Sequence, residues 1–202
     1  MKLLKQLIII LFLIPFTIFS QQLELDKQSY QKIDSLFNSY HSKTEPSSTF
    51  RILQNGEIIY SNQIGLANLE HQIPITETTR FNIASNSKQF TTYLALLLEE
   101  EGKLSFNDDI REHLKELAHL PYKVTVKQLT NHTHGLPNID ELTEINGEIN
   151  SMHNYKVLDI LLKVKSINFK PSSRYQYNNT GYILLAEILE RVSKKPFEEL
   201  LE

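Results

Sequence analysis

A serine and a lysine stand three residues apart, as Ser85 and Lys88, where a polar turn runs into an apolar helical segment. Residues at positions i and i+3 of a helix share one face, so the Lys88 ammonium can lie beside the Ser85 hydroxyl. A serine becomes a useful nucleophile when a neighbouring base takes its proton, and a lysine can share that task. The spacing therefore predicts a nucleophile at Ser85, with Lys88 assisting its deprotonation.

The spacing alone is not specific, because Ser29 and Lys32 repeat it, and roughly one such pair per chain is expected by chance. Ser29 lies in an ordinary amphipathic segment, whereas Ser85 begins a run so apolar that it is expected to cross a core. The first helical turn could also supply backbone N–H groups to a developing oxyanion. The alternative for Ser85 is a helix cap alone.

A tyrosine and an asparagine, Tyr177 and Asn179, stand two residues apart just before a second apolar helical segment. Alternate residues of an extended turn point to the same side. A tyrosine near a lysine can exchange a proton with a serine, and an asparagine amide can hold both the lysine and a substrate carbonyl. Tyr60 and Asn62 repeat this spacing on a predicted strand, where packing and turn formation are the expected roles.

The elements that position these residues follow from the pattern of apolar residues. The segment 25–40 predicts an amphipathic helix, and 50–60 predicts a hairpin, because two β-rich runs flank Asn55-Gly56. Two strands alone are marginal in water, so this hairpin needs further strands or a helix against it. Irregular structure is expected over 65–81 and 171–179, and helices over 85–101, 105–114, 157–165, 182–192 and from Pro196 onward, with a loop leaving a helix at 131–137.

Composition indicates a soluble globular protein with 41% hydrophobic residues, 22% charged residues and a formal net charge of −3. No basic patch favours a nucleic-acid partner. The chain has no cysteine, which excludes disulfides and lipidation of a mature N-terminal cysteine. The acidic runs at 99–101 and 108–109 are expected to be solvated helix ends.

Residues 1–20 are predicted to be a secretory signal peptide, because two lysines precede an apolar run over 7–16. This run is short for a membrane span, so no stable span is expected after cleavage, and the protein is expected to be secreted or periplasmic. An uncleaved anchor is the alternative, because Ile18 is a poor residue near the expected cleavage site. Residues 21–202 are then expected to form one domain.

Together these features resemble the serine β-lactamase and penicillin-binding-protein superfamily, specifically its class C β-lactamase, D,D-peptidase and esterase branch. The resemblance covers nearly all of the chain after the predicted signal peptide. It implies an α+β fold of the β-lactamase/transpeptidase type, in which a helical region packs on an antiparallel sheet with the active site between them. The matching segments occur in the family's order, at the Asn55-Gly56 hairpin, 65–70, 81–91, 129–137 and 171–185.

The resemblance also implies a role for each site residue. Ser85 would form the acyl-enzyme, Lys88 would assist its deprotonation, Tyr177 would act as general base and then protonate the leaving group, and Asn179 would orient substrate. No cofactor and no metal are expected. His132 and His134 could suggest a metal site, but they have no recognised third ligand nearby, and the resemblance implies that a histidine at His132 fixes a loop by hydrogen bonding.

One departure from the family concerns its third motif, Lys-Thr-Gly or His-x-Gly, which lies on a strand that supplies the second oxyanion-hole N–H. Neither tripeptide follows Tyr177. Two other features agree with a missing third motif: the hairpin has no partner strands, and the last helix has no capping signal. The sequence is therefore expected to be truncated, with the C-terminal strands missing. A smaller departure is Ser172, where the family often has glycine.

The expected function is therefore that of an exported serine hydrolase acting through an acyl-enzyme. The substrate would be a β-lactam, a D-alanyl peptide of the peptidoglycan type or a small ester. The alternative is a non-catalytic truncated remnant, or a ligand-binding relative of the same fold, because one oxyanion donor is expected to be missing.

Overall fold

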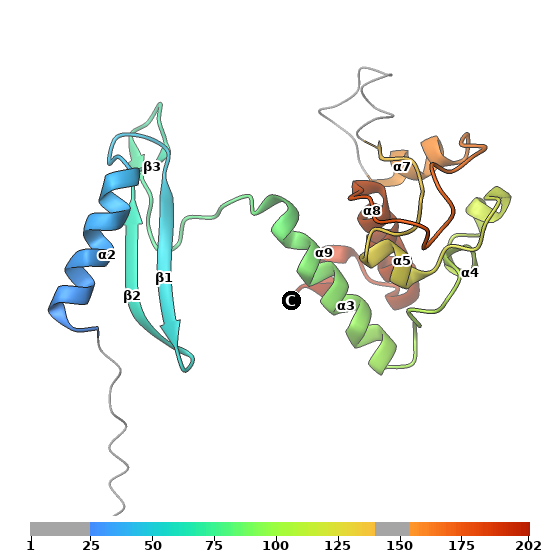
Figure 1. Ribbon diagram of the computed structural model, residues 1–202, viewed down its shortest axis with the longest axis horizontal. Coiled ribbons are helices and arrows are strands. Elements are labelled where there is room, and N and C mark those ends of the chain that lie inside the picture. The colour runs from blue at the N-terminus through green and yellow to red at the C-terminus, as the bar shows by residue number, and fades with distance from the viewer. Residues whose placement is uncertain (1–24, 140–153) are drawn as a thin grey trace, which may run out of the picture. The chain divides into compact units, whose positions relative to one another are not determined.

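The computed structural model describes residues 25–139 and 154–202, and the chain divides into two units, Met1–Phe81 and Asn82–Glu202 (Figure 1). The predicted signal peptide lies outside the described residues, as does most of the polar segment that follows residue 139. Within the part of the chain that is described, no helix is both long enough and apolar enough to cross a membrane.

The first unit contains the predicted helix and hairpin. Helix α2 spans Lys27–Tyr40, and strands β1 (Ser48–Gln54) and β2 (Glu57–Ile64) pair antiparallel. At the turn between the strands, Asn55 and Gly56 both have positive φ, at 52° and 85°. A two-residue hairpin turn of type I′ needs this conformation at both central positions, which confirms the prediction made from Asn-Gly.

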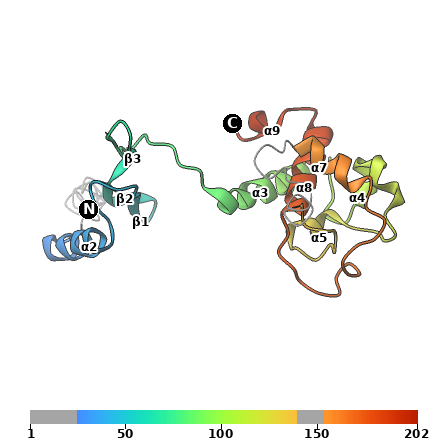
Figure 2. The same cartoon turned by 90° about the horizontal axis from the view of Figure 1, so that it is seen from above.

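Helix α2 supplies the partner that the hairpin needs, and Figures 1 and 2 both show it alongside β1 and β2. Phe37 stacks on Phe50 with ring centroids 3.8 Å apart. The buried Tyr60 hydroxyl donates to Asp34 Oδ1 at 2.6 Å, and Asn62 Nδ2 donates to the same oxygen at 3.1 Å. The Tyr60 and Asn62 side chains therefore tie the hairpin to the helix, a structural role, although the expected one was packing and turn formation.

The prediction of irregular structure over 65–81 is wrong in part, because β3 (Leu66–Asn68) and β4 (Ile73–Pro74) form a second small antiparallel hairpin. Gly65, with φ of 89°, makes the entry to β3 possible, since a Cβ there would lie 2.4 Å from the Glu45 carbonyl oxygen. Strands this short carry no alternating apolar pattern, which is why the sequence did not predict them.

The second unit is helical in its described residues. The structure confirms helices near the predicted places, with different bounds. The helix expected over 105–114 is confined to Ile110–His113, α7 begins and ends earlier than expected, α8 begins before residue 182, and Pro196 precedes the last helix as its cap. The elements are the 3-10 helices η1 (Ala84–Ser87) and η2 (Lys115–His119) and the α-helices α3 (Lys88–Glu100), α4 (Ile110–His113), α5 (Val126–Thr130), α7 (Asn154–Leu161), α8 (Asn179–Ser193) and α9 (Phe197–Leu200).

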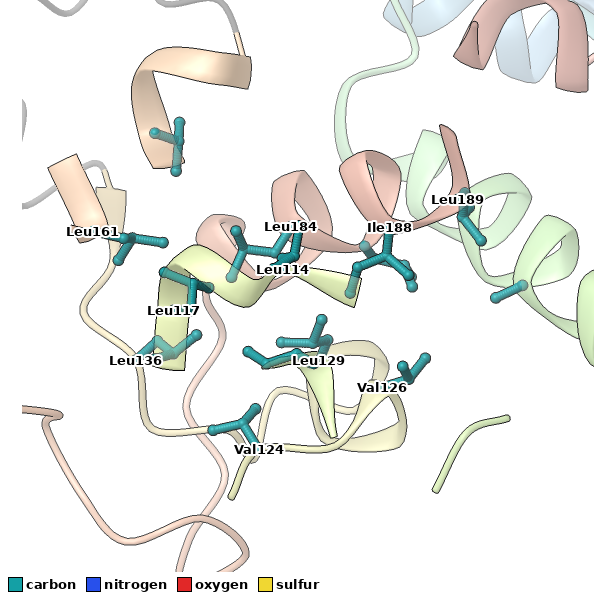
Figure 3. Close-up of a cluster of buried hydrophobic side chains, with 14 of the residues drawn as sticks. Leu114, Leu117, Val124, Val126, Leu129, Leu136, Leu161, Leu184, Ile188 and Leu189 are labelled. Carbon is teal, nitrogen blue, oxygen red and sulfur yellow. The ribbon is translucent and has the colours of Figure 1, made fainter. Parts of the chain in front are cut away.

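Helix α8 forms the centre of the apolar core of this unit. Figure 3 shows its Leu184 and Ile188 among side chains from the other helices and loops, including Leu114 and Leu129. Burying each such side chain contributes on the order of 1.5 to 3 kcal/mol. The core fixes the start of α8 relative to α3, and both predicted site motifs lie at or just before the N-terminal ends of these two helices.

The acidic pair at 108–109 is not solvated as expected. Asp109 is 8% exposed and caps α4 through a capping box with Glu112. Burial raises the pKa of Asp109, but the hydrogen bonds and charge of Arg111 outweigh burial and hold that pKa below its usual value. With a helix expected over 105–114, Asp109 would lie inside its first turns, whereas it is the N-cap of the shorter α4, a position that aspartate often occupies.

Candidate active site

Ser85 lies in a strained turn at the entry to α3. The preceding residue, Ala84, has a positive φ of 46°, and its N–H donates to Asn82 Oδ1 at 2.8 Å. A left-handed conformation costs a residue with a Cβ roughly 1 to 2 kcal/mol. A 3-10 turn then carries Ser85, and the α-helix begins only at Lys88, three residues later than predicted. The turn leaves the Ser85 side chain exposed at the helix entry.

The Ser85 hydroxyl is in contact with two of the residues predicted to act on it. Its Oγ lies 2.6 Å from the Tyr177 hydroxyl, and either oxygen can be the donor. The Lys88 ammonium donates to the same Oγ at 3.1 Å. The alternative that Ser85 is only a helix cap does not fit, because neither η1 nor α3 has a side-chain cap.

Asn179 completes the group, since Lys88 Nζ also donates to Asn179 Oδ1, at 2.8 Å. The lysine ammonium thus connects the serine at the entry to α3 with the first residue of α8. The second serine–lysine pair of the chain has no comparable arrangement, because Ser29 Oγ donates to Asp26 Oδ2 at 2.6 Å in the first turn of α2. The structure therefore brings together the four predicted site residues, and their catalytic roles stay predictions.

Asn178, between the tyrosine and the asparagine of the site, holds both in place. Its side chain is buried, accepts from Thr180 N–H at 2.8 Å and donates to the Leu136 carbonyl at 2.7 Å. Its backbone N–H donates to His132 Nδ1 at 3.3 Å. The sequence analysis missed this residue, although an asparagine directly before an apolar helix is a strong N-cap signal.

A second set of bonds fixes the loop that faces the start of α8. Thr180 Oγ1 donates to the Pro137 carbonyl and accepts from Ile139 N–H, both at 2.8 Å. The Asn179 N–H donates to Asn138 Oδ1 at 3.3 Å. The side chains of Thr180 and Asn138 thus pair with backbone groups of the loop and of the start of α8. This support keeps Tyr177 and Asn179 within reach of Ser85 and Lys88.

His132 ties its own loop to the segment before α8, which is the kind of hydrogen bond that the resemblance implied. Besides accepting from Asn178, its ring lies 4.6 Å from the Tyr177 ring, centroid to centroid. Burial, and next the positive charge of Lys88, lower the pKa of His132. Among the described residues, no group of three or more histidines, aspartates or glutamates is placed to hold a metal ion.

His134 lies deeper, 1% exposed, and its Nδ1 accepts from Leu136 N–H at 3.0 Å. Burial, and to a smaller degree His132, lower the pKa of His134 to about 4. The ring also explains Gly181, because a Cβ there would meet His134 Nε2 at 2.7 Å. The loop under the site therefore packs around a neutral imidazole.

We expect this imidazole to make the fold sensitive to acid. The unfolded chain binds a proton at His134 near pH 6.5, and the folded chain does so only near pH 4, so the stability present above pH 6.5 is lost as the pH falls toward 4. The loss should reach about 3 kcal/mol in the free energy of unfolding. Urea unfolding between pH 7 and 4 measures it.

The matched variant is His134→Asn, whose side-chain oxygen can replace Nδ1 as the acceptor and does not titrate. Its free energy of unfolding should change less over the same pH interval than that of the wild type. Equal pH dependence in both proteins would show that another group causes the loss.

Next to the lysine–asparagine contact lies a hollow of about 390 Å³ in the second unit. Its polar part comes from Ser87, Lys88, Thr91 and Asn179, and Ile139, Ile183 and Phe197 are among the apolar side chains that line it. Polar groups beside apolar walls are typical of small-molecule sites. The arrangement as a whole can hold a small ligand beside a hydroxyl that has a proton acceptor and a cation in contact with it.

Comparison with known proteins gives a family and a fold. Residues 33–202 match the family model described as Beta-lactamase. Penicillin-binding protein 4* of Bacillus subtilis (strain 168) is 32% identical over 180 residues, which are 87% of this chain and 39% of that protein. The chain therefore spans about two fifths of the length of this curated relative.

Two solved structures show the same fold. The penicillin-binding protein homologue from Pyrococcus abyssi, described as octameric, superposes with a TM-score of 0.72 and 26% identity, over 88% of this chain and 41% of the other. EstCE1, described as a hydrolase with promiscuous acyltransferase activity, superposes with a TM-score of 0.74 and 22% identity, over 86% of this chain and 50% of the other. Helices and antiparallel strands of the β-lactamase/transpeptidase type are thus confirmed as the fold class.

Proposed function

Because the chain belongs to the beta-lactamase family, whose members are hydrolytic serine enzymes, we propose that Ser85 forms an acyl-enzyme with the carbonyl carbon of a small substrate. The observation that carries the proposal is the contact of one serine oxygen with both a phenol, at 2.6 Å, and an ammonium, at 3.1 Å. Both distances lie within the reach that proton transfer and charge stabilisation require.

In the proposed reaction, Tyr177 takes the Ser85 proton as Oγ attacks the substrate carbonyl carbon. Tyr177 does so as a phenolate, whose negative charge the Lys88 ammonium stabilises before the transfer, and the same ammonium stabilises the charge that develops on the serine oxygen as its proton leaves. When the tetrahedral intermediate collapses, Tyr177 returns the proton to the leaving nitrogen or oxygen, and Ser85 keeps the acyl group as an ester. Water then attacks the ester with Tyr177 as base, which regenerates the serine hydroxyl.

Asn179 has two proposed tasks, to hold the lysine and to orient the substrate carbonyl. Its Oδ1 accepts from Lys88, so its amide nitrogen is directed by that bond and by the capped start of α8. We propose that the substrate is a β-lactam, as the names of the penicillin-binding relatives suggest, a D-alanyl peptide or a small ester. The proposed setting is an exported domain, residues 21–202, acting outside the cytoplasm.

Replacing Tyr177 with phenylalanine is expected to slow acylation of Ser85 by roughly a hundredfold to ten-thousandfold, because the proton acceptor is lost while the ring stays. The rate of covalent labelling by a fluorophosphonate measures this. The matched control is Tyr175→Phe, since Tyr175 is exposed and also touches the His132 ring. Equal rates in Tyr177→Phe and wild type would exclude Tyr177 as the base.

The experiment that tests the proposed function compares three substrates on the folded chain: a chromogenic cephalosporin, a D-alanyl-D-alanine peptide and a nitrophenyl ester. Hydrolysis of at least one, with an acyl adduct visible by intact mass, is expected. A protein that is folded by circular dichroism, hydrolyses none of the three and takes no adduct would instead be a non-catalytic relative of the family.

A further inference from the structure

The Lys88 ammonium lies against two aromatic rings, of which only one belongs to a residue already given a role. Lys88 Nζ is 5.0 Å from the centroid of the Tyr177 ring and 5.4 Å from the centroid of the Tyr182 ring. A cation within about 6 Å of a ring centroid is attracted to the negative face of that ring. The second ring therefore contributes to where the ammonium rests.

Tyr182 is itself held from three helices. It lies on α8, its hydroxyl donates to the Thr130 carbonyl of α5 at 2.8 Å, and the Thr92 hydroxyl of α3 lies 3.1 Å from the same oxygen. Because the phenol uses its proton on Thr130, Thr92 is left to donate. The ring also lies near His132, with centroids 5.3 Å apart. The ring is thus a fixed platform and not a mobile surface side chain.

The Tyr182 ring and the two hydrogen-bond acceptors of Lys88 together determine the position of the Lys88 ammonium. Lys88 has a flexible four-carbon stem, so the hydrogen bonds to Ser85 Oγ and Asn179 Oδ1 alone leave it much rotational freedom. A ring beside the ammonium restricts that freedom, and a lysine that is already in place loses less entropy when the transition state forms.

We propose that Tyr182 is a positioning residue, whose ring holds the Lys88 ammonium at the point from which it donates to Ser85 and Asn179. The inference rests on the proposed acyl-enzyme function and adds to it a residue that acts on the nucleophile through the lysine, and whose side chain also lines the hollow beside Lys88. The aromatic ring is the active part of Tyr182, and the hydroxyl only fixes the ring.

Two variants separate ring from hydroxyl. Tyr182→Leu removes the ring and should slow fluorophosphonate labelling of Ser85 by a factor between about two and thirty, the range that a cation–π contact allows. Tyr182→Phe keeps the ring and should label at close to the wild-type rate, although it loses the bond to Thr130 and should melt at a lower temperature than the wild type. A purely structural role predicts the reverse, with labelling rates that follow the melting temperatures.

A spectroscopic signature tests the position of the lysine without any activity. In protein labelled with ¹³C at the lysine ε-carbon, the Lys88 ε-methylene protons should be shifted upfield by the two rings, and Lys88→Arg identifies the signal by its loss. The shift should persist in Tyr182→Phe and shrink in Tyr182→Leu. A Lys88 signal in the range of the solvent-exposed lysines of the wild type overturns the inference, whether or not Ser85 reacts.

The two proposals fail in distinguishable ways. Tyr182→Leu labelling at the wild-type rate overturns the inference and leaves the acyl-enzyme proposal intact. A wild type that is folded, shows the shifted Lys88 signal and takes no label overturns the acyl-enzyme proposal, and with it the catalytic purpose of the platform.

Discussion

Replacing Ser85 with alanine is expected to abolish covalent labelling and to lower any ester hydrolysis by at least about a thousandfold, because a nucleophile acts with its partners as a unit. The change removes one oxygen at an exposed turn, and with it the hydrogen bonds that this oxygen makes to Tyr177 and Lys88. The free energy of unfolding should change little, since alanine is compatible with a helical turn. The measurement is the initial rate of fluorophosphonate labelling together with urea unfolding.

The chain carries its own matched control in the second serine–lysine pair. Ser29→Ala removes a hydroxyl at the same spacing from a lysine, but there the hydroxyl only donates to the capping Asp26. This variant should label at the wild-type rate. Loss of labelling in both variants would mean that the label reports on folding and not on a nucleophile.

Replacing Lys88 with arginine is expected to reduce acylation by roughly a hundredfold to ten-thousandfold. Arginine keeps the positive charge, but its planar guanidinium is larger than an ammonium and cannot point one compact donor at both Ser85 Oγ and Asn179 Oδ1. Arginine also stays protonated under all working conditions, so any share that Lys88 takes in moving the proton is lost. Single-turnover labelling of Lys88→Arg measures the effect.

The control for charge and size is Lys32→Arg, in the pair on α2 that has no tyrosine or asparagine partner in the described contacts. It should leave the labelling rate unchanged. If Lys88→Arg labels as fast as the wild type, the lysine acts only as a positive charge, and the geometric role derived from its two hydrogen bonds is wrong.

The sequence predicted most of the fold and of the site group because the strongest signals are local. The Asn55-Gly56 turn needs positive φ at both residues, and only such residue types adopt it at low energetic cost, so the turn was located correctly, although β2 extends four residues beyond the predicted end of the hairpin. The helical spacing of the apolar residues Leu184, Leu185, Ile188 and Leu189 likewise predicted α8. Ser85 and Lys88 share a helix face by spacing, which required no knowledge of the rest of the chain.

Other features could not be predicted because they depend on long-range contacts. The bond of Asn178 to the Leu136 carbonyl, the bond of Thr180 to the Pro137 carbonyl and the contact of the His134 ring with Gly181 all join segments about 40 to 50 residues apart. The positive φ of Ala84 is imposed by the turn around it, since alanine has no intrinsic preference for that region. Ser172 also adopts a positive φ, of 66°, which gives a physical reason for the glycine expected at that position.

The contacts at Lys88 also change how the motif is interpreted. Spacing alone assigns the lysine to the serine, whereas the structure shows it donating to Asn179 as well and lying against the rings of Tyr177 and Tyr182. In the proposed reaction, a lysine with two acceptors and two aromatic neighbours mainly supplies a fixed cation. Tyr177, 2.6 Å from Ser85 Oγ, is then the better placed of the two to carry the proton.

The most direct measurement is the location of the adduct itself. The folded protein is incubated with a fluorophosphonate, its intact mass is recorded, and the labelled peptide is sequenced by tandem mass spectrometry. We expect one label per chain, attached to Ser85. A label on any other residue, or a folded chain that stays unlabelled, would contradict the claim that Ser85 is an activated nucleophile.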